Sequence, residues 1–220
     1  MRLLILNDNV PSKGLLNDWG WSVLVEGKDR FIFDADTWPE VLSHNSKSLG
    51  VSLKGIDFVV LSHWHYDHYG GLSLVGKLNP GIPLYAPPGN WVLALRWGFR
   101  AVEVLDAGRI ADGVWTSGPL GGFEQAVGVE TSSGFVVIVG CSHPGVDRLT
   151  RAVLDVSGHG KAHLVIGGFH YPTQTALDRL ARMAEFIAPA HCSGEEAKAY
   201  VRKKYPDKFV GVRTGSVIEL

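Results

Sequence analysis

Cysteine is scarce in this chain, which has only Cys141 and Cys192 among its 220 residues. Both stand beside histidines, in the segments Cys141-Ser142-His143 and His191-Cys192. We expect two buried thiols that pack as small hydrophobic groups. A disulfide between them is disfavoured in a reducing compartment, and metal ligation by Cys141 is a further alternative.

Long apolar runs and an excess of charge are also missing. No run approaches the ~18 apolar residues that a membrane helix needs, and the apolar part of Met1–Asp8 is too short for a signal peptide. The formal net charge is −1, which argues against a nucleic-acid partner. We therefore expect a single domain, residues 1–220, in the cytoplasm, acting on a small molecule without a membrane or nucleic-acid partner. The composition does not indicate an oligomeric state.

Histidine, by contrast, is concentrated in one place. Of the 9 histidines, three fall within the six residues His63-Trp64-His65-Tyr66-Asp67-His68. This stretch follows the apolar run 58–61, which reads as a buried strand, and precedes Gly70-Gly71. The four polar side chains are thus predicted on a loop at a strand end, where a rigid scaffold can aim them. Imidazole and carboxylate groups are typical ligands of zinc and similar divalent metals.

Strand and helix patterns follow one another twice along the chain. The predicted strands are 2–6, 21–26, 30–34, 58–61, 83–86, 102–105, 124–130, 135–139, 162–166 and 216–220. The predicted helices are 38–49, 72–78, 146–156, 173–186 and 195–204. Strands come early in each half and helices follow. This order predicts an α+β protein with two sheets packed face to face and helices outside, a four-layer αββα sandwich.

Three further histidines share one local context. His143, His170 and His191 each come shortly after an apolar run that reads as a strand. In a sandwich such strand ends can converge on the edge that carries the histidine-rich loop. A catalytic zinc takes three protein ligands and keeps a water, so these residues are candidates to complete a metal site. The remaining histidines, His44 and the pair at 159 and 163, lack this context and read as surface or core residues.

These motifs resemble those of a known family. The pattern His63-x-His65-x-Asp67-His68 is similar to the HxHxDH signature of the metallo-β-lactamase superfamily. The segments at 140–143, 167–170 and 189–194 resemble the GCSH, GGFH and P-x-HC-x-G segments of its dihydropterin-aminobenzene-phosphate synthase-like branch, and Asn7-Asp8-Asn9 fits that branch as well. The resemblance implies a metallo-β-lactamase fold and a divalent-metal site, and it leaves the substrate open.

The sequence departs from the superfamily pattern in two places. Val114–Pro119 stands where a TPGH-type turn would supply the third ligand, so we expect His143 to take over as a shared ligand. Asp34-Ala35-Asp36 replaces the customary Asp-Thr-Gly, and Asp34 is expected to orient a ligand imidazole. The resemblance then assigns His63, His65 and His143 to one metal, and Asp67, His68 and His191 to the second. His170 is expected to be a ligand, a general acid or a substrate contact.

The predicted chemistry is hydrolysis by a metal-dependent hydrolase. A bound divalent metal lowers the pKa of its water to roughly 7, and Asp67 could accept a proton from that water. We expect two metal ions, zinc in the first place, with manganese or iron as alternatives. The substrate class is an ester, phosphoester, thioester or amide. Four aromatic residues either form a wall for a pterin-like ring or pack the base of the site: Trp64, Tyr66, Phe169 and Tyr171.

Rival functions have recognisable sequence features. Di-iron members of the superfamily that handle oxygen or electrons carry glutamate where His65 stands and use flavin partners. A nuclease would need more basic surface than the small patch formed by Lys198 and residues 202–204. A metal-binding module without activity is disfavoured by the complete set of ligands.

Overall fold

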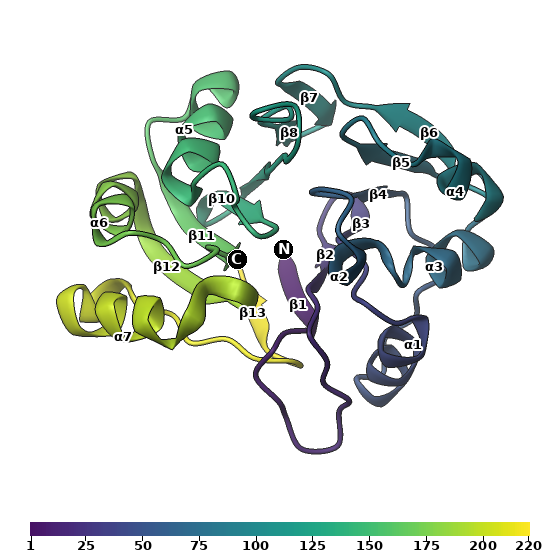
Figure 1. Cartoon of the computed structure of the whole chain (residues 1–220), viewed down its shortest axis with the longest axis horizontal. Helices are drawn as coiled ribbons and strands as arrows, with labels where there is room; N and C mark the ends of the chain where they lie inside the picture. Colours follow the sequence, from purple (N-terminus) through teal and green to yellow (C-terminus); the bar gives the residue numbers. More distant parts are fainter. The chain divides into compact units, whose positions relative to one another are not determined.

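The computed structural model describes residues 1–220 and divides them into two compact units. The first unit comprises Met1–Val104 and Arg213–Leu220, and the second comprises Leu105–Val212 (Figure 1). The α+β class and the two predicted sheets are confirmed, since each unit contains one sheet with helices. The single domain over residues 1–220 stays a prediction.

The first unit is built on a seven-stranded sheet in the order β13-β1-β2-β3-β4-β5-β6. Its strands are β1 (Arg2–Asn7), β2 (Ser22–Glu26), β3 (Arg30–Phe33), β4 (Phe58–Val60), β5 (Pro83–Ala86), β6 (Arg100–Glu103) and β13 (Val217–Glu219). Pairing is antiparallel from β13 to β3 and parallel from β3 to β6. The strand β13 comes from the far end of the sequence and covers the outer edge of β1.

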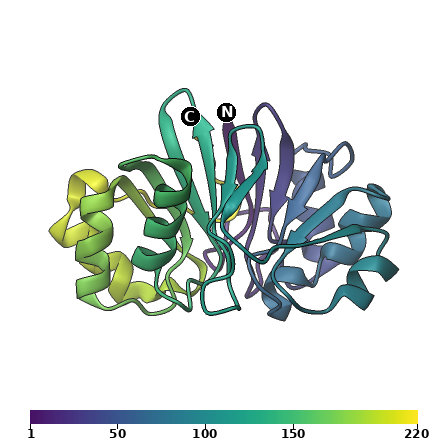
Figure 2. The same cartoon turned by 90° about the horizontal axis from the view of Figure 1, so that it is seen from above.

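Four helices accompany this sheet: α1 (Pro39–Ser48), α2 (Tyr66–Tyr69), α3 (Leu72–Leu78) and α4 (Trp91–Arg96). Alternate strand residues such as Leu4, Leu24 and Ile32 form one apolar cluster with Leu42 of α1 and Leu72 of α3. The helices therefore cover one face of the sheet (Figure 2), and their packing holds the carboxyl end of β4 in place.

The second unit is built on a six-stranded sheet in the order β12-β11-β10-β9-β8-β7. Its strands are β7 (Gly108–Ala111), β8 (Val114–Thr116), β9 (Val127–Thr131), β10 (Gly134–Val139), β11 (Ala162–Gly168) and β12 (Ala184–Ala190). The helices are α5 (Val146–Ser157), α6 (Gln174–Met183) and α7 (Gly194–Lys204), with short 3-10 turns η1 (His191–Ser193) and η2 (Pro206–Lys208). Because β10, β11 and β12 are parallel, their carboxyl ends lie at one edge of the sheet.

The structure corrects several predicted elements. The helix predicted over 173–186 ends at Met183, and the next residues open β12, where Ala184 pairs with Ala162 of β11. The apolar stripe of α6 runs directly into a buried strand, so its period alone could not mark the boundary. The short elements α4, β7 and β8 were not predicted. Both cysteines are buried and neither forms a disulfide, as expected. None of the helices combines the length and apolar character that a membrane crossing requires.

Candidate metal centre

The histidine-rich loop of the first unit gathers its polar side chains into a cluster at the carboxyl end of β4. The rings of His63 and His65 have centroids 4.5 Å apart, and those of His63 and His68 are 4.2 Å apart. Asp67 Oδ2 lies 3.6 Å from His68 Nε2. His63 and His68 are buried, whereas His65 is exposed. The predicted ligands of this loop are thus neighbours in space.

Gly70 and Gly71 allow this loop to close against the segment that follows β3. A Cβ atom on Gly70 would lie 1.8 Å from the carbonyl oxygen of Thr37, and one on Gly71 would lie 2.1 Å from that of Ala35. The close approach is fixed by backbone hydrogen bonds, such as the one from Ala35 N to His68 O at 2.7 Å. Any side chain at either glycine would therefore displace the loop that carries His68.

One buried carboxylate sets the orientation of two imidazoles. Asp34 Oδ2 accepts hydrogen bonds from His68 Nδ1 at 2.6 Å and from Ser62 Oγ at 2.7 Å. Because a carboxylate only accepts, the single hydroxyl proton of Ser62 points to Asp34. Ser62 Oγ must then accept from His63 Nδ1, which is 2.9 Å away. Both rings carry their proton on Nδ1, which leaves each Nε2 with a lone pair for a metal. Asp34 thus makes the expected hydrogen bond to an imidazole, and the role of that imidazole as a metal ligand stays a prediction.

The second unit gathers a matching cluster at the carboxyl ends of its parallel strands. Cys141 and His143 follow β10, and His170 follows β11. One ligand atom from each of these three residues lies within 4.8 Å of the others, and Cys141 and His191 also have ligand atoms within this distance. The rings of His143 and His170 are 4.2 Å apart. The three strand-end histidines thus come from one edge of one sheet.

Glu124 is the residue of this cluster that the sequence did not reveal. Its side chain is fully buried. Oε1 accepts from Ser142 N at 2.6 Å, and Oε2 accepts from both His143 N at 2.7 Å and His143 Nδ1 at 2.8 Å. Glu124 therefore does for His143 what Asp34 does for His68, because it fixes the proton on Nδ1 and leaves Nε2 as the ligand atom. An acidic residue just before the apolar strand β9 was the only available signal.

Backbone conformation at both clusters is unusual. The non-glycine residues with positive φ are Asp34, Asp36, Ser142, His170, Tyr171 and His191. All of them lie in the two clusters or within two residues of a predicted ligand or of its orienting carboxylate. A left-handed residue other than glycine costs on the order of 1–3 kcal/mol and persists only where its surroundings hold it in place. Such strain is typical of functional sites, and here it sets the directions of His170 and His191.

The aromatic residues named in the prediction have different surroundings in the structure. Trp64 packs against Trp91 at 5.7 Å and donates its indole N–H to Pro87 O, and Phe169 is in the core of the second unit. For these two residues the structure supports the packing alternative. Tyr66 is 46% exposed and contacts Trp38, which is 45% exposed.

Trp19 is a further exposed aromatic residue that the sequence did not reveal. Its side chain is 52% exposed, and its indole Nε1 donates to Asp67 Oδ2 at 3.0 Å. The contact joins residues 48 positions apart through an irregular loop, so no local pattern could predict it.

The other histidines lie outside both clusters. His44 Nε2 is 3.3 Å from Gly14 O, His159 stacks on Phe135, and His163 Nδ1 is 2.9 Å from Glu185 Oε2. These contacts agree with the expected surface and packing roles.

The donor atoms of the two clusters fit a divalent transition metal. They comprise imidazole nitrogens, one partly buried carboxylate and one buried thiol, and three of the imidazoles have a tautomer fixed for Nε2 ligation. Imidazole with carboxylate suits zinc, iron or manganese, whereas magnesium and calcium prefer oxygen ligands alone. The assignment of individual residues to individual metals stays a prediction.

Comparison with solved structures bears on the fold. A crystal structure of a metal-dependent hydrolase of the beta-lactamase superfamily matches with a TM-score of 0.81 and 24% identity, covering 100% of this chain and 99% of that one. Zn²⁺-bound PqqB from Methylobacterium extorquens matches with a TM-score of 0.63 and 12% identity, covering 100% of both chains. These likenesses confirm the predicted metallo-β-lactamase fold.

Comparison of sequences identifies the family. A 7,8-dihydropterin-6-methyl-4-(beta-D-ribofuranosyl)-aminobenzene-5'-phosphate synthase from Methanocaldococcus jannaschii is 26% identical over 251 residues, covering 87% of this chain and 85% of its own. A second protein of that organism, named as uncharacterized, is 39% identical and covers 97% of this chain and 98% of its own. The family model described as the metallo-beta-lactamase superfamily matches residues 20–185. Since this match spans well over half of the sequence, the chain belongs to the metallo-beta-lactamase superfamily.

Proposed function

We propose that this protein is a hydrolase that uses two divalent metal ions, zinc in the first place, to cleave a small molecule that carries a phosphoester or a pterin-like ring. The observation that carries the proposal is the pair of buried carboxylates, Asp34 and Glu124, that fix the proton of three imidazoles on Nδ1. The proposed ligands are His63, His65, Asp67, His68, His143 and His191. A metal held by such ligands supplies a water of pKa roughly 7 and a positive charge beside the reacting oxygens.

Two side chains are proposed to move protons. One carboxylate oxygen of Asp67 accepts a hydrogen bond from Trp19 Nε1 and lies beside His68. The carboxylate is therefore positioned to accept a proton from the attacking water. His170 is exposed and has a left-handed backbone conformation. The centroid of its ring lies 4.2 Å from that of His143. We assign it to proton donation to the leaving group or to contact with the substrate.

Exposed aromatic residues of the first unit support the proposed substrate class. Trp19, Trp38 and Tyr66 present aromatic surface in the first unit, and such surface suits a planar ring. The product named for the M. jannaschii synthase contains a dihydropterin, an aminobenzene and a phosphate. That name also favours a second candidate, a synthase that joins such rings by displacement at the same metals.

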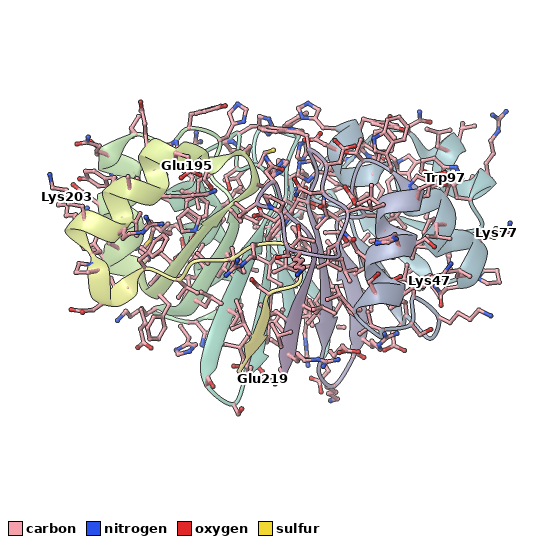
Figure 3. All side chains as sticks on the ribbon, turned by 90° about the horizontal axis from the view of Figure 1, so that it is seen from below. Lys47, Lys77, Trp97, Glu195, Lys203 and Glu219 are labelled. Atoms are coloured by element: carbon pink, nitrogen blue, oxygen red, sulfur yellow. The ribbon has the colours of Figure 1, made fainter.

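A small molecule is proposed rather than a nucleic acid. Three of the four basic residues of α7, at 202–204, fall in its last turn, with Glu195 at the opposite end of the helix from Lys203 (Figure 3). The fourth, Lys198, forms an ion pair with Glu195 at 2.9 Å. Cations in the last turn complement the helix dipole, which accounts for this patch without a partner.

Elemental analysis of the purified protein tests the proposal directly. We expect about two equivalents of divalent metal per chain, since a catalytic zinc uses three protein ligands and six are proposed. The same preparation is assayed against phosphodiester, phosphomonoester, lactam and thioester substrates, and against a mixture of a pterin alcohol ester with an aminobenzene. Trace metal alone, after zinc reconstitution as well as on purification, would rule out both candidate functions. Joining of the two rings without hydrolysis would favour the synthase.

Asp34→Ala is expected to weaken metal affinity by about 10–100-fold, the usual effect of removing a group that orients a ligand imidazole. The substitution frees the rings of His68 and His63 to rotate and to change tautomer. Competition with a chromophoric zinc chelator measures the affinity. Glu185→Ala is the matched control, because it removes a carboxylate from the Nδ1 of His163 outside both clusters. Equal affinity in wild type and Asp34→Ala would contradict the orienting role.

Trp19→Leu is expected to weaken binding of free pterin by about 2–10-fold, the range of an aromatic stacking contact. Fluorescence titration of the pterin measures the dissociation constant. Trp19→Phe keeps a ring but loses the hydrogen bond to Asp67, so it should bind pterin nearly as wild type does. Unchanged binding in Trp19→Leu would remove Trp19 from the proposed substrate surface.

A further inference from the structure

A cleft between α5 and α6 in the second unit carries an unusual concentration of arginine. The two helices lie side by side (Figure 1), and the cavity between them has a volume of about 470 Å³. Its lining includes Arg148 and Arg151 from α5 and Arg179 and Arg182 from α6. None of the predicted metal ligands lines it.

Helical spacing explains why these side chains share one cavity. Arg148 and Arg151 are three residues apart on α5, and Arg179 and Arg182 are three residues apart on α6. Residues at this spacing lie on one face of a helix. The opposite faces are occupied by buried residues such as Leu149 and Leu180, which belong to the core. Two arginine pairs are therefore held on facing helices by a rigid core.

The cleft retains positive charge after its internal ion pairs are counted. Its lining has four arginines against Asp147 and Asp155, a net charge of +2 in a chain whose total is −1. Arg151 pairs with Asp155 at 3.8 Å and Arg179 with Asp147 at 3.4 Å. Both pairs are long, and their arginine side chains are 54% and 59% exposed, so the pairs stabilise the fold little and do not account for the cluster.

The other two arginines have no carboxylate partner. Arg148 donates only to the carbonyl oxygen of Pro144 at 3.2 Å, and Arg182 makes no side-chain hydrogen bond or ion pair. Both guanidinium groups keep most of their donors available. A guanidinium presents these donors as a planar fork that matches two oxygens of a phosphate.

We propose that the α5–α6 cleft binds a small phosphorylated organic molecule. Charge of about −2 on a phosphate or diphosphate matches the +2 of the lining. The volume exceeds the need of a phosphate alone and falls in the range of about 300–1,000 Å³ typical of small-molecule sites. Ala152 and Met183 add apolar surface to the same cavity, which suits the organic part of the ligand. The site is independent of the proposed catalytic function.

Isothermal titration calorimetry with inorganic pyrophosphate and with ADP, on the metal-loaded full chain, tests this proposal. We expect saturable binding of both probes. The double variant Arg148→Gln/Arg182→Gln should weaken it by roughly tenfold or more, the effect of losing charge-assisted hydrogen bonds to a phosphate. The matched control is Arg96→Gln, because Arg96 is also an exposed arginine in the last turn of a helix. The dissociation constants of Arg96→Gln for both probes should stay within about twofold of those of the wild type, a difference too small to separate from experimental error.

Three results would overturn the proposal. One is the absence of saturable binding at concentrations up to about 5 mM of either probe, because a dissociation constant above that limit is too weak for a functional site. Another is unchanged binding in the double variant with a native circular dichroism spectrum, which would place the anion elsewhere, for example at the metals. The last is tighter binding of a single-stranded RNA that the double variant abolishes, which would make the cleft a nucleic-acid surface.

Discussion

Asp67→Asn is expected to lower turnover by about 10²–10⁴-fold, the contribution of a positioned general base, while the protein stays folded. Asparagine has almost the same shape as aspartate, and its amide oxygen can still accept the hydrogen bond from Trp19 Nε1. It cannot accept a proton near neutral pH, and it is a weaker metal ligand. The measurement is kcat on the substrate of the panel that the wild type turns over fastest, with the metal content of both proteins determined in parallel.

Asp57→Asn serves as the control for this experiment. Asp57 is exposed just before β4 and accepts a hydrogen bond from Arg30 N, so it has the same chemistry outside the cluster. Turnover in that variant should equal that of the wild type. Should Asp67→Asn retain wild-type kcat at full metal occupancy, another group activates the water, and Asp67 loses its proposed role as proton acceptor.

Glu124→Ala is expected to lower the free energy of unfolding by about 2–5 kcal/mol. The substitution removes the buried carboxylate to which Ser142 N and His143 N both donate hydrogen bonds. Each buried donor that is left unsatisfied costs about 1–3 kcal/mol. The Nδ1 of His143 loses the same partner, so metal affinity should fall as well. Urea unfolding monitored by tryptophan fluorescence measures the stability.

Glu124→Gln separates charge from shape. In the wild type both carboxylate oxygens accept hydrogen bonds. The glutamine amide keeps one acceptor oxygen and places an NH₂ group where the other oxygen stood, opposite a donor. The Glu124→Gln variant should therefore be destabilised too. Glu185→Ala is again the control, because its carboxylate is exposed. A change below about 0.5 kcal/mol in Glu124→Ala, the size of an ordinary surface substitution, would show that the carboxylate does not hold this loop.

Regular elements with a strong hydrophobic period were predictable from the sequence. The helix predicted over 72–78 is found as Leu72–Leu78, and the one predicted over 146–156 ends one residue later at Ser157. The candidate ligands were also predictable, since each histidine follows an apolar run that forms a strand. Short elements such as α4 carry too few residues for a period to be distinguished from chance.

The groups that orient the ligands were harder to predict, because their contacts are not local. Glu124 meets His143 across 19 positions, and Trp19 meets Asp67 across 48. A single sequence contains no pattern that links such pairs, and only the folded sheet brings them together. Asp34 was predictable because the superfamily motif marks its position.

The pairing of β1 with β13 has a consequence for synthesis on the ribosome. The last strand of the first unit lies beyond the whole of the second unit, Leu105–Val212, in the sequence. At about 5–20 residues per second, translation of that segment leaves the outer edge of β1 unpaired for roughly 5–20 s. This edge belongs to the apolar segment Leu3–Leu6, and an open apolar edge is a template for pairing with another chain. Slow or stalled translation after residue 104 therefore exposes nascent chains to pairing through β1, and a chaperone that covers this strand would protect them until residues 217–219 emerge.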